Sequence, residues 1–290
     1  MSQTHHPNKE HSLVEKGAIH YIEFIESVGV QNMDGEPRVA LITGGVRGIG
    51  NACVEHFTRK DYAVVFTDVS AEDGDHVAAA FAAQGRRVAF VPGDVSQEAD
   101  CVHAVQAAVT RFGRLDVLVA NAGVQTPGSL LDSTTEDWHH VLAVNLLGVV
   151  YVCKAALPVM IAQGAGAIVV VSSLNALRGF PGMAAYDASK AAVLAVVRDI
   201  AVEHGARGIR ANAVCPGATL TDFHIRNAAK RGVSESALRD STKGYGLLGR
   251  VAEPSEIAAV IGFLAGPDAS FITGETLVAD GGYSIIGARH

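Results

Sequence analysis

The chain has 290 residues, 49% of them hydrophobic and 18% charged, and its formal net charge is −7. This balance indicates a folded protein with a buried core and excludes an intrinsically disordered chain. Because the charge is negative and no lysine- or arginine-rich block occurs, we expect neither nucleic acid nor a membrane surface as a partner. No apolar run approaches the length that spans a bilayer, so we expect no membrane segment.

Residues 1–36 form an N-terminal extension that stands apart from the pattern after it. Residues 33–37 would make a normal chain start, so a misassigned start codon is one interpretation. In the other, apolar residues of the extension line a short helix that packs on the core or on a neighbouring subunit. Four histidines here lack any standard ligand spacing, and the N-terminus lacks a signal-peptide pattern. We therefore expect no metal site.

The four cysteines are widely separated and form no C-x-x-C pair. We expect them to be buried thiols of a cytoplasmic protein, without a disulfide or metal role. They are Cys53, Cys101, Cys153 and Cys215.

The first predicted strand, residues 38–42, runs directly into a glycine-rich turn at residues 43–50. A helical pattern follows over residues 48–59. Glycine allows a tight turn and lets a phosphate approach the backbone, and the free N–H groups that start the helix favour an anion. The spacing, T-G-x-x-x-G-x-G, differs from the G-x-G-x-x-G fingerprint, but its place between a strand and a helix predicts a dinucleotide site.

Strand-like and helix-like segments then alternate to the end of the chain, which predicts a doubly wound α/β fold with a parallel sheet covered on both faces. The further predicted strands are residues 63–67, 88–91, 117–120, 167–171, 210–214 and 276–278. The further predicted helices are residues 71–84, 98–112, 136–163, 186–204 and 254–264. In such a fold the ligand lies at the carboxyl ends of the strands.

Tyr186 and Lys190 are four residues apart in the predicted helix 186–204 and therefore share one helix face. An ammonium beside a phenol favours the phenolate and lowers its pKa, which suits a general acid or base. The alternative is a surface aromatic ring beside a solvated lysine. Ser173 lies thirteen residues before Tyr186, whereas its neighbour Ser172 lacks that spacing.

Taken in order, these motifs resemble the short-chain dehydrogenase/reductase family over residues 37–284. They are the T-G-x-x-x-G-x-G turn, Asn121-Ala122-Gly123, Asn145, Ser173, Tyr186, Lys190 and Pro216-Gly217. The resemblance implies that residues 37–290 form a single dinucleotide-binding catalytic domain. It also implies a Rossmann-like sheet of seven strands in the order 3-2-1-4-5-6-7 and a homotetramer.

The resemblance implies a set of cofactor-binding residues along the carboxyl edge of the sheet. Besides Tyr186 and Lys190, they are Gly44, Arg47, Gly48, Ile49, Gly50, Asp68, Asp94, Val95, Asn121, Ala122, Gly123, Pro216, Gly217, Thr219 and Thr221. At Thr219 the family commonly has isoleucine, and the expected contact there is made by the backbone.

Asp68 ends the second predicted strand, where a carboxylate can bind ribose hydroxyls and repel a 2′-phosphate. This favours NAD. Arg47 points the other way, because in the family a basic residue in the turn often accompanies NADP; Val69 supplies no second basic partner. NAD is therefore the expected cofactor and NADP the alternative. Asp68 could instead cap the helix that opens near Ser70.

The implied reaction is hydride transfer between the nicotinamide and a secondary alcohol or ketone. Tyr186 would be the acid or base, Lys190 would lower its pKa and hold the nicotinamide ribose, and Ser173 would bind the substrate oxygen. Asn145 would hold a water that links Lys190 to solvent, or would be an ordinary polar helix residue. Two alternatives stay open: an NADP-dependent ketone or 3-oxoacyl reductase, and a catalytically silent NAD-binding sensor.

The sequence leaves the substrate open. Segment 222–245 is a candidate part of the pocket wall, and residues 223–244 within it have the character of a mobile lid with several cations, which would either meet an acidic substrate or form a solvated helix face. Candidate pocket residues outside this segment are Gln125, Thr126, Asn175, Leu177, Phe180 and Met183.

Overall fold

A computed structural model describes residues 36–285 of the chain. These residues contain a seven-stranded, fully parallel sheet in the order β3-β2-β1-β4-β5-β6-β7, which confirms the predicted topology. The strands are β1 (Val39–Thr43), β2 (Ala63–Asp68), β3 (Val88–Pro92), β4 (Val117–Ala120), β5 (Gly166–Val171), β6 (Ile209–Pro216) and β7 (Thr276–Ala279).

The strands are apolar throughout because both faces of the sheet are covered. In β1, Leu41 pairs with Val65 of β2 and Leu118 of β4, and it faces one core cluster. The next residue, Ile42, faces the opposite cluster, as the two-residue period of a strand requires. The predicted doubly wound arrangement is thus built around two separate hydrophobic cores.

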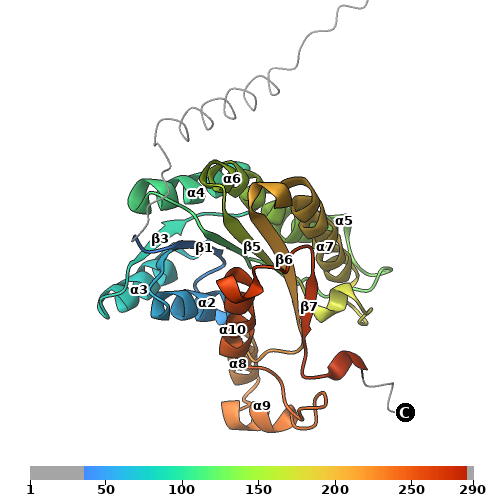
Figure 1. The fold of residues 1–290 in the computed structure, drawn as a ribbon. Coiled ribbons are helices and arrows are strands. Elements are labelled where there is room, and N and C mark those ends of the chain that lie inside the picture. Colours follow the sequence, from blue (N-terminus) through green and yellow to red (C-terminus); the bar gives the residue numbers. More distant parts are fainter. Residues whose placement is uncertain (1–35, 286–290) are drawn as a thin grey trace, which may run out of the picture.

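Helices cover both faces of this sheet (Figure 1). On one face lie α4 (Glu98–Phe112), α6 (Gly148–Gln163) and α7 (Ala184–His204). On the other lie α2 (Gly48–Arg59), α3 (Ala71–Ala82) and α10 (Pro254–Ala265). Two short helices, α8 (Asp222–Lys230) and α9 (Glu235–Ser241), follow β6 and project away from the sheet (Figure 1).

The predicted helix 136–163 is present, but it is not uniform. It consists of α5 (Thr135–Leu142), a π-helical turn (Ala143–Leu147) and α6. This 29-residue helix is also long and apolar enough to cross a membrane, because its most apolar 18-residue window has a mean hydropathy of 1.9. The expectation that no apolar run approaches the length of a membrane span was therefore wrong. Half of that window is buried, and α6 packs in the core, as a core helix of a soluble protein does.

All four cysteines are free and buried, as expected. Burial raises the pKa of each thiol, to about 12 for Cys101 and Cys153. Among residues 36–285 no group of His, Cys, Asp or Glu could hold a metal ion. The two interpretations of the N-terminal extension lie outside the described residues.

Candidate active site

The glycine turn after β1 and the Asn-Ala-Gly segment after β4 are joined into one unit. The Thr43 hydroxyl accepts hydrogen bonds from the backbone N–H groups of Asn121 and Ala122, both at 3.0 Å. The Asn121 amide in turn donates to the carbonyls of Thr43, at 2.9 Å, and Gly44, at 3.1 Å. Because β1 and β4 are neighbours in the sheet, residues 78 positions apart meet at its carboxyl edge.

The glycines of this unit are required by close contacts. A Cβ on Gly50 would lie 1.9 Å from the carbonyl oxygen of Gly44, and one on Gly44 would lie 2.9 Å from the Cα of Ala122. Gly44 also has a φ of +67°, which favours glycine. A Cβ on Gly123 would lie 3.3 Å from Lys190 Nζ. Because these glycines carry no Cβ, the backbone N–H groups at the N-terminus of α2 stay accessible, and a pyrophosphate could approach them closely.

Two carboxylates and one arginine define the end of this crevice beyond β2. The Asp68 carboxylate accepts hydrogen bonds from the N–H groups of Val46 and Ser70, both at 3.2 Å. Ser70, not Asp68, is the N-cap residue of α3. Arg47 forms an ion pair with Asp73, and the Ser70 hydroxyl and Arg47 together hold the pKa of Asp73 below its ordinary value. Arg47 is thus already matched by a carboxylate.

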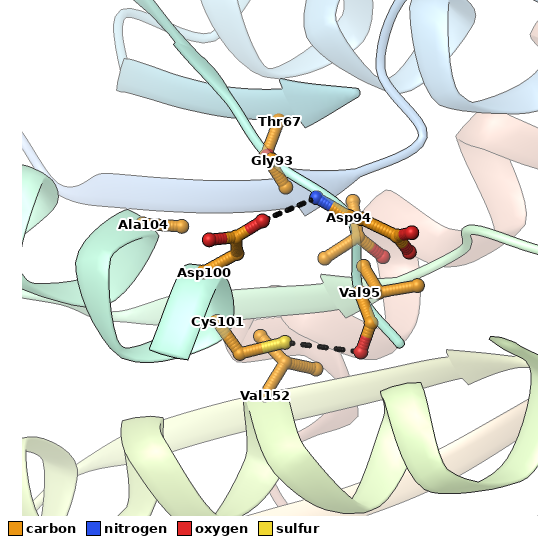
Figure 2. Close-up of a pocket in the computed structure, with 9 residues that line it drawn as sticks. Thr67, Gly93, Asp94, Val95, Asp100, Cys101, Ala104 and Val152 are labelled. Atoms are coloured by element: carbon orange, nitrogen blue, oxygen red, sulfur yellow. Dashed lines mark hydrogen bonds between the residues drawn. The ribbon is translucent and has the colours of Figure 1, made fainter. Parts of the chain in front are cut away.

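Asp94 and Val95 follow β3, whose last residue pairs with Asp68. Asp94 N donates to the Asp100 carboxylate at 2.9 Å, and the Cys101 thiol lies 3.5 Å from the Val95 carbonyl (Figure 2). The space that they line, about 170 Å³, is too narrow to admit a water molecule. It is packing beneath the edge of the sheet where the adenosine is expected, and it is too small for a ligand.

Ser173, Tyr186 and Lys190 come together at the carboxyl end of β5. Both Tyr186 and Lys190 are buried, with 9% and 4% of their surface exposed. The Tyr186 hydroxyl is hydrogen-bonded by the side chains of Ser173 and Gln125. Lys190 Nζ lies 5.8 Å from the centre of the Tyr186 ring and donates to the Val171 carbonyl at 2.9 Å. The alternative of a surface aromatic beside a solvated lysine is therefore excluded.

The pKa of Tyr186 differs from the expectation. Burial raises the pKa of the Tyr186 hydroxyl above 10, and the hydrogen bonds from Gln125 and Ser173 offset this only in part. Burial also lowers the pKa of Lys190 to about 8. The expected lowering of the Tyr186 pKa by Lys190 is therefore not what the structure gives, because desolvation acts on both groups.

Asn145 lies in the π-helical turn and is fully buried. Its Oδ1 accepts from Val124 N at 2.8 Å, and its Nδ2 donates to the Val124 carbonyl and to the Ser189 hydroxyl, both at 3.0 Å. The side chain thus ties the segment after Gly123 to α7. The implied role in holding a water near Lys190 stays a prediction.

The two adjacent serines have different surroundings. Ser172 donates to the Lys190 carbonyl at 2.7 Å and is therefore used to hold α7. Ser173 accepts from Asn175 N at 3.1 Å, and the Asn175 amide donates to the Asp187 carboxylate at 2.6 Å. The turn that carries Ser173 is therefore fixed by hydrogen bonds through Asn175 to Asp187, and Ser173 contacts Tyr186 from this turn. Sequence reasoning missed both this bracing by Asp187 and the contact of Gln125 with Tyr186, because neither belongs to a recognisable spacing.

The segment after β6 folds back onto the crevice. Gly217 N donates to the Ala279 carbonyl at 3.0 Å, and a Cβ on Gly217 would lie 2.7 Å from the Cβ of Asp280. Pro216 is buried at the end of β6, and the Thr219 hydroxyl donates to the Gly217 carbonyl at 3.1 Å. The expected cofactor segment 216–221 is thus held against β7.

At the far end of this segment, a carboxylate reaches the glycine turn. Thr221 is the N-cap residue of α8, and a Cβ on Gly48 would lie 3.2 Å from its methyl group. Gly48 N donates to the Asp222 carboxylate at 3.1 Å. Ile49 packs its side chain against the core beneath. A protein carboxylate therefore sits at the helix start where the sequence predicts a phosphate, and no motif indicated it.

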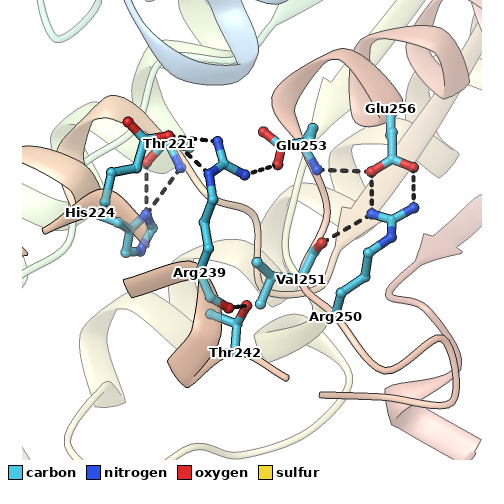
Figure 3. Close-up of polar contacts among 9 residues, drawn as sticks. Thr221, His224, Arg239, Thr242, Arg250, Val251, Glu253 and Glu256 are labelled. Carbon is cyan, nitrogen blue, oxygen red and sulfur yellow. Dashed lines mark hydrogen bonds and ion pairs between the residues drawn. The ribbon is translucent and has the colours of Figure 1, made fainter. Parts of the chain in front are cut away.

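Two cations of the lid segment, Arg239 and Lys243, form ion pairs, and Figure 3 shows the pairs of Arg239 with Glu253 and of Arg250 with Glu256 at the base of the lid. Arg239 pairs with both Glu235 and Glu253. Arg250 pairs with Glu256 through two hydrogen bonds of 2.7 Å, and the pKa of Glu256 falls to about 2, chiefly because of this guanidinium. Lys243 pairs with Asp240 at 2.9 Å. These ion pairs support the interpretation of a solvated helix face.

The fold is a Rossmann-like α/β domain with a glycine turn at the carboxyl edge of its parallel sheet. The chain matches the family model described as enoyl-(acyl carrier protein) reductase over residues 44–284. It is 37% identical over 253 residues to the 2-(R)-hydroxypropyl-CoM dehydrogenase of Xanthobacter autotrophicus, covering 86% of this chain and 99% of that protein. It is 39% identical over 250 residues to the cis-4-hydroxycyclohexanecarboxylate dehydrogenase of Sinomonas cyclohexanicum, covering 86% and 97%.

The fold is similar to that of the aldohexose dehydrogenase of Thermoplasma acidophilum, with a TM-score of 0.79 and 28% identity over 88% of this chain and 97% of that one. The chain therefore belongs to the short-chain dehydrogenase/reductase family. It is an oxidoreductase, and the family implies a nicotinamide cofactor, NAD or NADP. The names of the relatives are consistent with a small-molecule substrate.

Proposed function

We propose that the protein is an NAD-dependent dehydrogenase that interconverts a secondary alcohol and a ketone. One observation carries this proposal: Lys190 is buried beside Tyr186 and Ser173 and, among residues 36–285, forms no ion pair with a carboxylate. A buried ammonium without a counter-charge destabilises a fold and is retained where it serves chemistry.

Each residue of this group has a distinct proposed task. Bound nicotinamide supplies or accepts the hydride. Tyr186 takes the alcohol proton in oxidation and returns it in reduction, and its place in the first turn of α7 puts the positive end of the helix dipole beside the phenolate. Lys190, next to the Tyr186 ring, would hold the nicotinamide ribose, while Ser173 and Gln125 orient the hydroxyl and hold the substrate oxygen.

The preference for NAD is supported by the charges at the adenosine end. Asp68 faces the glycine turn, and Arg47, the residue that favoured NADP, is engaged by Asp73. A 2′-phosphate would have to displace that carboxylate and approach a second one. We therefore rank the NADP-dependent ketone or 3-oxoacyl reductase below the NAD-dependent dehydrogenase. Dissociation constants for NADH and NADPH test the ranking, and equal or tighter binding of NADPH would reverse it.

The reaction is tested with a panel of secondary alcohols, followed by absorbance of the reduced nicotinamide. Tyr186→Phe should abolish turnover and leave NADH binding nearly intact, because only the proton-carrying oxygen is lost. Tyr151→Phe is the matched control, since this tyrosine lies in α6 and has no part in the site. Turnover that survives in Tyr186→Phe would remove Tyr186 from the proton role.

We also propose a homotetramer in the cytoplasm. Several large apolar side chains are exposed, among them Val202 of α7 and Phe271 shortly before β7, and a subunit contact would cover such side chains. The four free thiols suit a reducing compartment. Sedimentation of the purified chain tests the assembly, and a monomer at working concentration would refute it.

A further inference from the structure

Three aromatic rings form a stack beside the catalytic group. The rings of Tyr245 and Tyr283 are 4.5 Å apart and nearly parallel, at 5°. Phe180 stacks on Tyr283 from 6.4 Å, at 23°. We call Phe180, Tyr245 and Tyr283 the aromatic wall. The guanidinium of Arg178 lies over the Tyr283 ring, 5.5 Å from its centre.

Hydrogen bonds tie the aromatic wall to both sides of the proposed reaction centre. Phe180 N donates to the carboxylate of Asp187, the residue after the catalytic tyrosine, at 3.0 Å. The Tyr245 hydroxyl accepts from Ala218 N, inside the cofactor segment 216–221, at 3.3 Å. A substrate held between the catalytic tyrosine and the nicotinamide would therefore extend its apolar body along this wall.

Arg178 is exposed, and its hydrogen-bond partners among residues 36–285 are neutral carbonyls. Its Nη1 donates to the carbonyls of Tyr283, at 3.3 Å, and Ser284, at 3.5 Å, and these contacts are long. Within residues 36–285 it forms no ion pair, whereas Arg47, Arg239 and Arg250 each pair with a carboxylate.

The two carboxylates of this region do not neutralise Arg178. Asp187 accepts from the Asn175 amide and from Phe180 N. Asp280 accepts from Gly282 N at 2.9 Å and Ser284 N at 2.6 Å. Each is engaged by neutral N–H donors, and among residues 36–285 neither forms an ion pair with Arg178, whose positive charge can therefore meet a ligand anion.

Resting on the proposed function, we propose that Arg178 recognises an anionic group on the substrate, which is then a secondary alcohol carrying a carboxylate or a similar oxyanion. Stacking on Tyr283 fixes the plane of the guanidinium, and its remaining N–H groups form the fork that binds a carboxylate through two hydrogen bonds. In this proposal the alcohol end of the substrate would bind at Tyr186 and its anionic end at Arg178, with its apolar body along the aromatic wall.

The test compares hydroxy acids with their methyl esters, which have nearly the same shape and no charge. The probes are 3-hydroxybutyrate, 4-hydroxycyclohexanecarboxylate and their esters, and the readout is the ratio of kcat/KM for acid and ester. In the wild type the acid should be preferred about tenfold or more, the size of a charge-assisted hydrogen bond at a partly solvated site. Arg178→Met should lower this ratio about tenfold through KM.

Two further variants sharpen the result. Arg178→Lys keeps the charge but loses the planar fork, and should retain only part of the preference. Lys60→Met removes an exposed cation at the C-terminal end of α2 and should leave the ratio unchanged. Equal use of acid and ester by the wild type, or a preference that survives in Arg178→Met, would overturn the inference.

Failure of the proposed dehydrogenase function can be distinguished from failure of the anion-site inference, because without that function neither the acid nor the ester is turned over. In that case calorimetry with the NADH-loaded protein decides the inference directly. Tighter binding of the acid than of the ester, lost in Arg178→Met, supports the anion site. Equal or undetectable binding of the acid refutes it.

Discussion

Replacing Lys190 with methionine should make the protein more stable and inactive. The fall of the Lys190 pKa from 10.5 to about 8 means that the folded state disfavours the ammonium by about 3 kcal/mol. Methionine removes this charge at similar volume. It also removes the hydrogen bond to the Val171 carbonyl, which costs roughly 1–2 kcal/mol. The expected net gain at neutral pH is therefore about 1–2 kcal/mol, or ~4 °C in Tm.

The effect of Lys190→Met on stability should depend on pH in a definite direction. Because the folded pKa of Lys190 lies below the unfolded value, the unfolded state binds more protons between about pH 8 and 10.5. The destabilisation by Lys190 is fully present below about pH 8 and disappears as the pH rises to 10.5. The stability advantage of Lys190→Met should therefore shrink over this window and end as a slight disadvantage, when only the lost hydrogen bond remains.

The assay is thermal unfolding of the protein without added cofactor, at neutral pH and near pH 10, together with turnover. Lys154→Met is the matched control: its ammonium is mostly exposed and pairs with Glu98, so its removal should change stability by less than about 1 kcal/mol at either pH. A lower Tm for Lys190→Met at neutral pH, or a difference from wild type that does not change with pH, would refute the reasoning about desolvation.

Three other predictions follow from the site. Asp222→Asn should tighten NADH binding several-fold, because the variant no longer has a negative charge at the Gly48 N–H, where the pyrophosphate is expected. Titration calorimetry measures the NADH dissociation constant, and an unchanged constant would contradict the prediction. Alcohol oxidation should speed up as the pH rises from 6 to 8, because the raised pKa of Tyr186 leaves little phenolate in this range and each rise in pH produces more of it. Ketone reduction, which uses the protonated Tyr186, should show no such rise. A flat pH profile of oxidation would argue against Tyr186 as the base. Gly50→Ala should fail to bind cofactor and lose stability, because its Cβ would lie 1.9 Å from the Gly44 carbonyl; normal NADH binding by a folded variant would show that the turn adapts.

Much of the fold could be predicted because its signals are local. The strand β1 is an unbroken apolar run, and the turn after it places glycine at Gly44 and Gly48, where φ is positive. The i, i+4 spacing of Tyr186 and Lys190 likewise follows from one helix. The π-helical turn around Asn145 was not foreseen, because one extra residue in a helix leaves no mark in the periodicity.

The amino-acid sequence alone determined the family, the strand order that the family implies, and the residues that meet at the carboxyl edge of the sheet, because their order and spacing along the chain carry that information. Only the tertiary structure decided the direction of the pKa of Tyr186, the pairing of Arg47 with Asp73 and the neutral surroundings of Arg178. Burial and charge pairing depend on which distant segments pack together. The distances between such segments cannot be inferred from the order of residues along the chain.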